Sequence, residues 1–495
     1  MNVCDLTEDE LALVFQWILI LDLVKLESVC IKFKVAVQLS LKHKTAITVT
    51  DLAKKDKSTK LEKFDFPLMP LIERFGPSVT MLDMSLLKYG IQAMASMNNY
   101  LMAKVANHMP KIKDFGEVDR MTLKLLMAYM KFTNRKVINN IFLNMTIGQV
   151  SGDGILISES TRNSVKSNLV ELATGGFKIR RLELADEIQT SVPLDYYQTL
   201  AQLVVNCEVE NLILHFGASH YGVTCGILSR IAPDQLVLNS LKSLSLCVGH
   251  SINFSDVVAF APNLVHLYLL FDSLPVNGFQ DILQFSKLKS FGIRFNSTLG
   301  AQNEPSTVIE QKWTSFVESF KPQAENLEWL SIQNQSAVKF KTANLVKYAL
   351  NVKALEIAVP ILENADIADF ELLDKLESLL IYVSNVKTVE QLLKVSNVKK
   401  LYLTMHMRNE FDKILKQKLE HLLDDHNKMT NRIVYTINKR PLLFVGKFAA
   451  LKTRPSASGY NSSFGSGLNV GNPLVGSNAF LDMFAYAYPL PGGLV

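Results

Sequence analysis

The chain has 495 residues, with 52 Lys and Arg against 47 Asp and Glu, so its formal net charge is 52 − 47 = +5. This near balance is not typical of a dedicated nucleic-acid-binding protein. Hydrophobic residues make up 48% of the chain and charged residues 20%, which excludes a mainly disordered protein. The five cysteines are odd in number and include no CxxC pair, which favours neither a disulfide framework nor a zinc module.

The N-terminus is acidic, whereas a secretory signal begins with basic residues. The most apolar stretch, Leu11 to Leu26, is interrupted by Asp22 and Lys25, so it does not read as a membrane span. We therefore expect a cytoplasmic and/or nuclear protein that contacts no membrane.

Residues 6–33 predict two or three short amphipathic helices. Thr7 and Glu10 form a capping-box pattern that starts a helix with one apolar face of Leu11, Val14, Phe15 and Ile18. A second helix is expected to start at Asp22 and to carry Leu23, Leu26, Val29 and Cys30. About forty residues bury too little apolar surface to be stable alone, so these faces need a partner or a neighbouring domain.

This stretch resembles an F-box, a family whose pattern matches in order and spacing at Leu6, Phe15, Asp22-Leu23, Val29-Cys30 and Phe33. The chain departs from the family at Thr7, where proline is usual, and at Phe33, where tryptophan is frequent. The resemblance implies docking to the Skp adaptor of a cullin-RING ubiquitin ligase through Leu6, Leu11, Phe15, Leu23, Val29 and Phe33. The alternative is a helical cap on the first repeat, which would bury Phe15 and Leu23 against the repeats, whereas a receptor would leave them partly exposed.

A repeat organises the rest of the chain. Nine segments fit the template apolar-x-x-apolar-x-apolar, and five of the eight spacings between their starts lie between 22 and 25 residues. The segments start at Ile179, Val209, Leu241, Leu264, Leu288, Leu327, Val352, Leu376 and Val398. The last two apolar positions alternate with polar ones, as in a strand with one buried face, and helical patterns follow several segments.

At these residues the sequence resembles the leucine-rich repeat family. The resemblance implies the α/β class: an irregular solenoid with parallel strands on its concave face, preceded by a small all-α F-box-like module. Most copies lack the Asn or Cys that the family usually places after the template block, although Cys247 is an exception and Asn334 lies one residue late; this departure predicts irregular arcs. The interval from Leu288 to Leu327 contains an insertion, roughly Leu299 to Asn326, with Trp313, Phe316 and Phe320 on one helical face.

These patterns predict six parts. They are a helical module (1–42), a basic linker (43–60), degenerate repeats (61–178), the main repeat array (179–405), a C-terminal cap (406–450) and a disordered tail (451–495). Among the degenerate repeats, the segments from Val79 and Ile138 fit the template, whereas the one from Ile112 has Glu117 at its third apolar place. The linker lysines could contact nucleic acid or anionic lipid, but interspersed carboxylates favour a solvated face.

The C-terminal cap is expected to hold a helix from Asn409 to His426 and one last strand over residues 431–438. The tail has Asp482 as its only charged residue from Pro455 onward. Its apolar and aromatic part, Ala479 to Tyr488, fits either a short docking motif or an adhesive end.

The concave face of such a solenoid consists of the residues between and just after the template's apolar positions. Exposed aromatic, arginine and histidine side chains there would dominate binding to another protein. The candidates for target binding are Arg181, His266, Tyr268, Arg294, Trp329, Gln333, Tyr382 and Tyr402. The alternative is that Trp329 and the tyrosines pack sideways on one another along the sheet.

Searches for catalytic motifs find no GxSxG, no Walker-type loop, no HExxH and no GxGxxG after a strand. We therefore expect no catalytic residue, no cofactor and no metal, although distant residues can converge in space. The sequence predicts a non-catalytic substrate receptor that joins a protein target to a cullin-RING ligase through the Skp adaptor. The alternative is a leucine-rich repeat scaffold without a ligase role.

Overall fold

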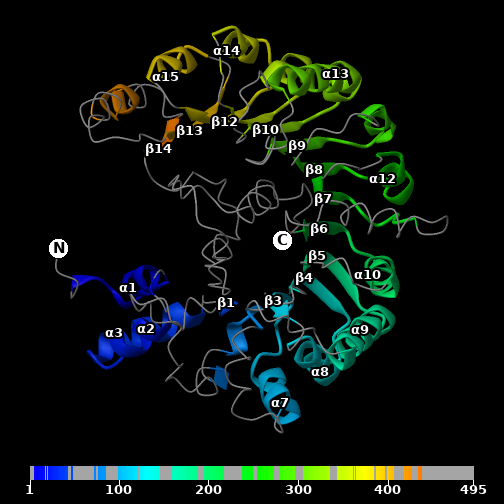
Figure 1. Ribbon diagram of the computed structural model, residues 1–495. Helices are drawn as coiled ribbons and strands as arrows, with labels where there is room; N and C mark the ends of the chain where they lie inside the picture. The colour runs from blue at the N-terminus through cyan, green and yellow to red at the C-terminus, as the bar shows by residue number, and fades with distance from the viewer. Residues whose placement is uncertain are drawn as a thin grey trace, which may run out of the picture. The chain divides into compact units, whose positions relative to one another are not determined.

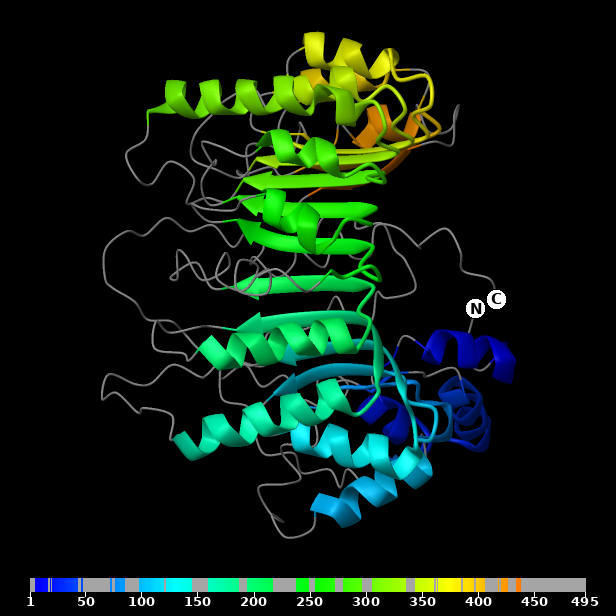
Figure 2. The same cartoon turned by 90° about the vertical axis from the view of Figure 1, so that its right-hand side faces the viewer.

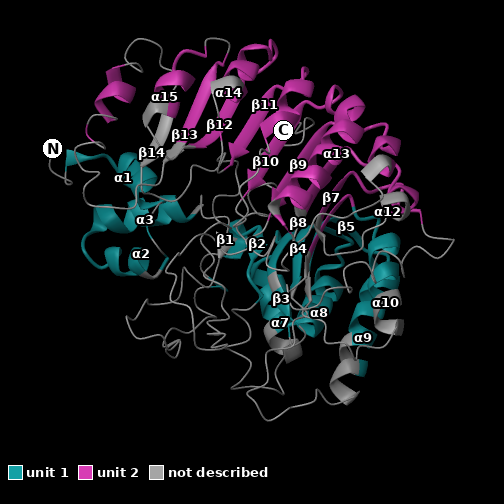
Figure 3. Ribbon diagram, turned by 45° about the horizontal axis from the view of Figure 1, so that its top comes forward, with its two compact units in different colours: residues 1–187, 193–209, 447–476 teal, residues 188–192, 210–446, 477–495 magenta. Residues whose placement is uncertain are grey.

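The computed structural model describes residues 5–16, 18, 20–42, 46–47, 72–73, 76–84, 98–119, 122–144, 159–186, 194–216, 237–248, 254–271, 279–295, 305–334, 343–359, 362, 364–383, 386–395, 398–405, 417, 420–425 and 433–437. Two compact units are present, which Figure 3 distinguishes by colour. The first contains α1 to β5 together with α10, and the second contains β6 to β14.

The first unit begins with three helices and continues with five strands. The helices of the N-terminal module are α1 (Glu8–Phe15), α2 (Ile20–Leu26) and α3 (Ile31–Lys42). The elements that follow are β1 (Ala46–Ile47), η2 (Gly76–Ser78), β2 (Met81–Leu82), α7 (Asn98–His108), β3 (Asp114–Asp119), α8 (Leu123–Thr133), β4 (Val137–Asn144), α9 (Glu159–Thr174), β5 (Lys178–Asp186) and α10 (Leu194–Asn206). Strands β1 to β5 pair in chain order and all in parallel.

The second unit consists of nine parallel strands, which also pair in chain order. The elements are β6 (Asn211–Phe216), β7 (Ser243–Val248), α12 (Phe254–Phe260), β8 (His266–Phe271), η4 (Phe279–Gln284), β9 (Ser290–Phe295), α13 (Ser306–Ala324), β10 (Trp329–Asn334), η5 (Ala343–Tyr348), β11 (Ala354–Ala358), α14 (Asn364–Glu371), β12 (Ser378–Val383), α15 (Val386–Leu392), β13 (Lys400–Met405) and β14 (Ile433–Ile437). Within this unit the helices lie on one side of the strands (Figure 1), and Figure 2 shows the strands stacked side by side.

The repeat template explains this arrangement. Each of the nine predicted segments forms one strand, and the register joins equivalent template positions, for example Leu330 with Phe291 on one side and Leu355 on the other. The template leucines point toward the helices and are buried, as Leu330 and Ile332 show at 0% exposure. One strand and one helix or turn per repeat, stacked in parallel, is the leucine-rich repeat solenoid, so the predicted fold class is confirmed.

The repeat that starts at Ile112 fits the template poorly in sequence. A one-residue bulge in β3 restores the burial pattern of the template. Phe115 pairs with Ile141, whereas Val118 pairs with Leu143, so the register shifts between Phe115 and Glu117. Val118 is 0% exposed and takes the buried place that the template assigns to Glu117. The copy is therefore a regular repeat with one extra residue.

The inserted segment between Leu288 and Leu327 forms α13, as predicted. Trp313, Phe316 and Phe320 are all 0% exposed and pack on Phe291 and Phe295 of β9. The Trp313 indole also donates a hydrogen bond to Asn344 Oδ1 at 2.8 Å. The inserted segment thus contributes aromatic side chains to the core between α13 and the sheet.

Some boundaries differ from the sequence prediction. Helix α2 begins at Ile20, so Asp22 lies in its first turn and does not start it. Strand β1 lies inside the range assigned to the basic linker and pairs with β2. Residues 431–438 contain the expected last strand, β14. Most of the helix expected from Asn409 to His426, and all of the tail, lie outside the described residues.

Candidate binding surfaces

The strand face of the second unit carries three rows of side chains, because alternate residues of each strand point away from the helices. The middle row follows the register Tyr268, Gly292, Ser331, Glu356, Leu380 and Tyr402. The row before it contains His266, Ser290 and Trp329, and the row after it contains Arg294, Gln333 and Tyr382. Seven of the eight predicted target-binding residues therefore share this face. Arg181 lies on β5 of the first unit, with a guanidinium nitrogen 3.6 Å from Glu183.

Small residues on β9 allow two aromatic rings to meet. Tyr268 and Trp329 stand on β8 and β10, which are two strand spacings apart, or about 9.6 Å. Their ring centroids are nevertheless 5.5 Å apart in an edge-to-face contact. Their partners on β9 are Gly292, opposite Tyr268, and Ser290, opposite Trp329. The rings thus meet above a strand whose side chains are too short to separate them.

Glu356 is the centre of a buried polar cluster. Its Oε2 accepts a hydrogen bond from Ser331 Oγ at 3.1 Å, and its Oε1 accepts one from Gln333 Nε2 at 2.9 Å. Burial raises the pKa of Glu356 to about 7, although these two donors and the charge of Arg294 act in the opposite direction. Burial likewise lowers the pKa of Arg294 to about 10.

Burial also shifts the pKa values of two other candidate residues, His266 and Tyr382, away from those of free side chains. His266 Nδ1 lies 2.8 Å from Ser290 Oγ, and burial lowers the pKa of His266 to about 4, so the ring is neutral at pH 7. Burial raises the pKa of Tyr382 well above 10, with a further contribution from Glu356. The cluster therefore combines one guanidinium, Arg294, with one carboxyl group, Glu356, whose charged form is disfavoured by burial.

The expected exposure of these side chains is wrong for several of them. Tyr268, Arg294, Trp329 and Gln333 are 6%, 3%, 1% and 2% exposed, whereas Arg181, His266, Tyr382 and Tyr402 are half-buried. The alternative of sideways packing is confirmed for Trp329 with Tyr268. Ser331, Ser290 and Gly292 are not among the candidates that the sequence predicts, although Ser331 occupies the template position between the last two apolar residues.

The second candidate surface is on the N-terminal module. Thr7 caps α1 as predicted, because its Oγ1 accepts from the Glu10 amide at 3.3 Å while Glu10 Oε2 accepts from the Thr7 amide at 2.7 Å. Phe15 on α1 contacts Phe33 on α3 at 5.4 Å between ring centroids. Helix α3 packs against both α1 and α2. The module therefore has a core of its own.

This core contains three of the residues assigned to adaptor docking. Leu11, Phe15 and Leu23 are 1%, 4% and 0% exposed, so the partial exposure expected of Phe15 and Leu23 in a receptor is not observed. Leu6 and Phe33 are half-buried, and Val29 is 62% exposed. Among the described residues of the module, the large apolar side chains that face solvent are Leu13 (61%), Val14 (52%), Val29 and Ile31 (83%). Of these, the F-box pattern implies an adaptor contact for Val29 alone.

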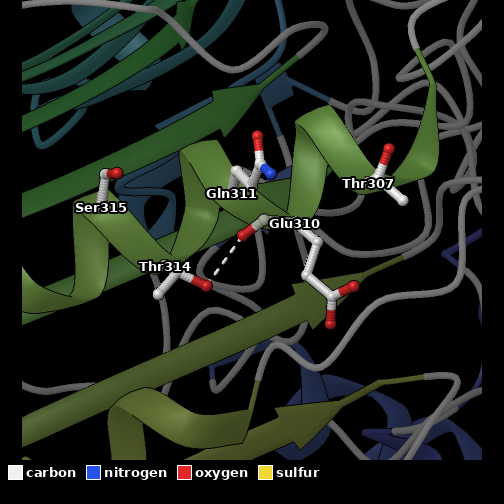
Figure 4. A pocket seen from close by; sticks show the side chains of 5 residues that line it. All are labelled: Thr307, Glu310, Gln311, Thr314 and Ser315. Carbon is white, nitrogen blue, oxygen red and sulfur yellow. Dashed lines mark hydrogen bonds between the residues drawn. The ribbon is translucent and has the colours of Figure 1, made fainter.

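The described residues contain no candidate metal site. No group of three His, Cys, Asp or Glu in that part of the chain is placed to hold a metal ion. A shallow depression on α13 is lined by Thr307, Glu310, Gln311, Thr314 and Ser315, all from one helix (Figure 4). Within it, the Thr314 hydroxyl donates to the Glu310 backbone carbonyl at 2.9 Å.

Among the described helices, none is long and apolar enough to cross a membrane.

Two solved structures are similar to the chain at low identity. The leucine-rich repeat-containing protein LegL7 from Legionella pneumophila is 14% identical, with a TM-score of 0.35, and the match covers 58% of this chain and 91% of that one. TLR13 in its complex with ssRNA13 is 13% identical, with a TM-score of 0.28, and the match covers 75% of this chain and 53% of that one. No protein-family model and no curated protein matches the chain. The assignment of the fold therefore rests on the parallel register and repeat spacing of the chain itself.

Proposed function

We propose that the protein is a non-catalytic substrate receptor that docks to the Skp adaptor of a cullin-RING ubiquitin ligase and binds a protein target on its repeats. The observation that carries the proposal is the apolar surface of the N-terminal module, defined as Leu13, Val14, Val29 and Ile31. These side chains are 52% to 83% exposed although the module has a complete core. Four large apolar side chains exposed on so small a module fit a protein-binding role.

The docking face in this proposal differs from the one that the F-box pattern implied. Leu11, Phe15 and Leu23 hold the three helices together, so their part is to shape the module. Leu13 and Val14 on α1, Val29 in the turn before α3 and Ile31 at the start of α3 are the side chains available to an adaptor. Ubiquitin transfer would belong to the partner subunits, and this chain would contribute proximity between ligase and target. A cytoplasmic and/or nuclear location follows from the proposal.

The experiment is a pull-down of the purified full-length chain with the Skp adaptor. Leu13→Asp combined with Ile31→Asp is expected to reduce binding at least about tenfold, because each substitution places a charge in the apolar interface. Leu372→Asp is the matched control, since Leu372 is 62% exposed and Leu13 is 61% exposed. Circular dichroism verifies that the variants remain folded. Phe15→Ala is unsuitable because it would empty the core of the module.

The competing function is a leucine-rich repeat scaffold whose helices only cap the repeats. A folded wild-type chain that does not bind the adaptor would support the scaffold and refute the receptor. Binding that survives the Leu13 and Ile31 substitutions would refute the docking face proposed above.

A further inference from the structure

The strand face of β8 to β12 in the second unit needs a covering layer. The helices and 3-10 turns of this unit lie on the opposite side of the strands, and among the described residues no helix or strand lies over this face (Figure 1). Trp329 and Leu380 are nevertheless each 1% exposed, and Tyr268 is 6% exposed. Side chains on one face of a sheet touch their neighbours only sideways, so burial to this degree requires contacts from above.

We propose that the C-terminal segment Ala479–Tyr488 of the same chain docks on this face as an intramolecular ligand. The segment reads AFLDMFAYAY and contains the chain's densest group of aromatic residues outside the repeats. Phe484, Tyr486 and Tyr488 follow one another at every second position, so an extended segment presents all three on one side. Aromatic rings on that side would stack against Tyr268, Trp329 and Tyr382.

The intervening chain is long enough for this contact. Strand β14 ends at Ile437, and 41 residues, 438–478, separate it from the segment. A flexible linker of that length has an end-to-end distance of about 35 Å. The distance from β14 to β8 is six strand spacings, or about 29 Å. The effective concentration of the segment at the face is then on the order of millimolar, so a weak intrinsic affinity suffices.

The charges of the two surfaces are compatible. From Pro455 to the C-terminus the only charged residue is Asp482, so docking removes one carboxylate from water. The face carries one guanidinium, Arg294 on β9, and one carboxyl group, Glu356 on β11, near its centre. A segment with more charges would lose more hydration than this buried face can replace. The docked segment would occupy the surface assigned above to the target, and it would do so whether or not the chain serves a ligase.

Photo-crosslinking in the full-length chain tests the contact. With benzoylphenylalanine in place of Phe484, intramolecular crosslinks are expected to residues 266–383. The same replacement of Tyr460, which lies in the Gly- and Ser-rich part of the tail, is the control and is expected to give few crosslinks there. Crosslinks from position 484 that fall elsewhere, or only between two molecules, would overturn the proposal.

Fluorine NMR of the chain labelled with 5-fluorotryptophan gives an independent readout. The variant Phe484→Ser/Tyr486→Ser/Tyr488→Ser is expected to shift the Trp329 resonance and to expose it to broadening by a soluble gadolinium chelate. Trp313, which is buried under α13, is the internal control and should not change. An unchanged Trp329 resonance in a folded variant would show that another part of the molecule covers the face.

Discussion

Glu356 shows how a single residue acquires its properties from its position on the sheet. The template places it between two apolar residues, Leu355 and Ile357, where an exposed glutamate would be unremarkable in a solenoid. In the folded protein it is 1% exposed and hydrogen-bonded through both carboxyl oxygens. Burial disfavours its charged form, and the neighbouring donors offset only part of that cost.

The raised pKa makes the stability of the second unit depend on pH. Between the ordinary value of 4.5 and the folded value of about 7, the folded state retains a proton that the unfolded state has released. The contribution of Glu356 to stability therefore falls as the pH rises through this range, by up to about 3 kcal/mol.

Glu356→Gln should remove this dependence, because the amide stays neutral at every pH. Its free energy of unfolding relative to wild type is expected to increase between pH 5 and pH 8. Urea unfolding followed by circular dichroism at the two pH values measures the difference. Glu371→Gln, at an exposed position on α14, is the control. The assignment fails if both variants show the same change with pH.

At the scale of the element, side chains outside the apolar template positions form hydrogen bonds between neighbouring repeats. Asn263 Nδ2 donates to the backbone carbonyl of Asn239 at 3.2 Å, and its Oδ1 accepts from Lys287 Nζ at 2.7 Å. Asn351 repeats the arrangement with the Glu325 carbonyl and Lys375, at 2.6 Å each. These asparagines precede the first apolar position of their repeats. Each binds backbone in the preceding repeat and a lysine in the following one.

Helix α13 depends on Trp313 for its attachment to the sheet. Trp313→Ala should lower the free energy of unfolding by about 3–5 kcal/mol, because it leaves a cavity between α13 and Phe295. Trp313→Phe keeps most of the packing and loses the hydrogen bond to Asn344, so its cost should be nearer 1 kcal/mol. Denaturant unfolding measures both. Equal losses in the two variants would show that packing is not the larger contribution.

At the scale of the whole molecule, the second unit shows a ladder of alternating charge along one edge of its sheet. The second template position carries Lys289, Glu328, Lys353, Glu377 and Lys399 in five successive repeats. Glu328 lies 3.6 Å from Lys289 and 2.9 Å from Lys353, and Glu377 lies 2.8 Å from Lys399. Each pair is exposed and individually weak. Alternation nevertheless favours the observed neighbours over a register shifted by one repeat.

Lys353→Glu would place a third negative charge between Glu328 and Glu377. The urea midpoint of unfolding should therefore fall, and the fall should diminish at high salt, which screens exposed charges. Lys394→Glu, an exposed substitution on the turn after α15, is the control for net charge. Equal, salt-independent effects in the two variants would contradict a role for the ladder.

The sequence by itself determined the repeating architecture. Apolar residues at fixed template positions can be buried together only if each copy forms a strand in the same register, and this periodicity predicted all nine strands. Local patterns predicted the aromatic helix α13, from Trp313, Phe316 and Phe320 on one helical face, and the cap at Thr7, from its spacing to Glu10. The set of solvent-facing side chains on the N-terminal module and the strand-face cluster were decided by the tertiary structure. Whether Phe15 or Leu13 faces solvent depends on where α3 packs, and whether Trp329 meets Tyr268 depends on the short residues of β9. Such contacts join residues far apart in the chain, and no local period records them.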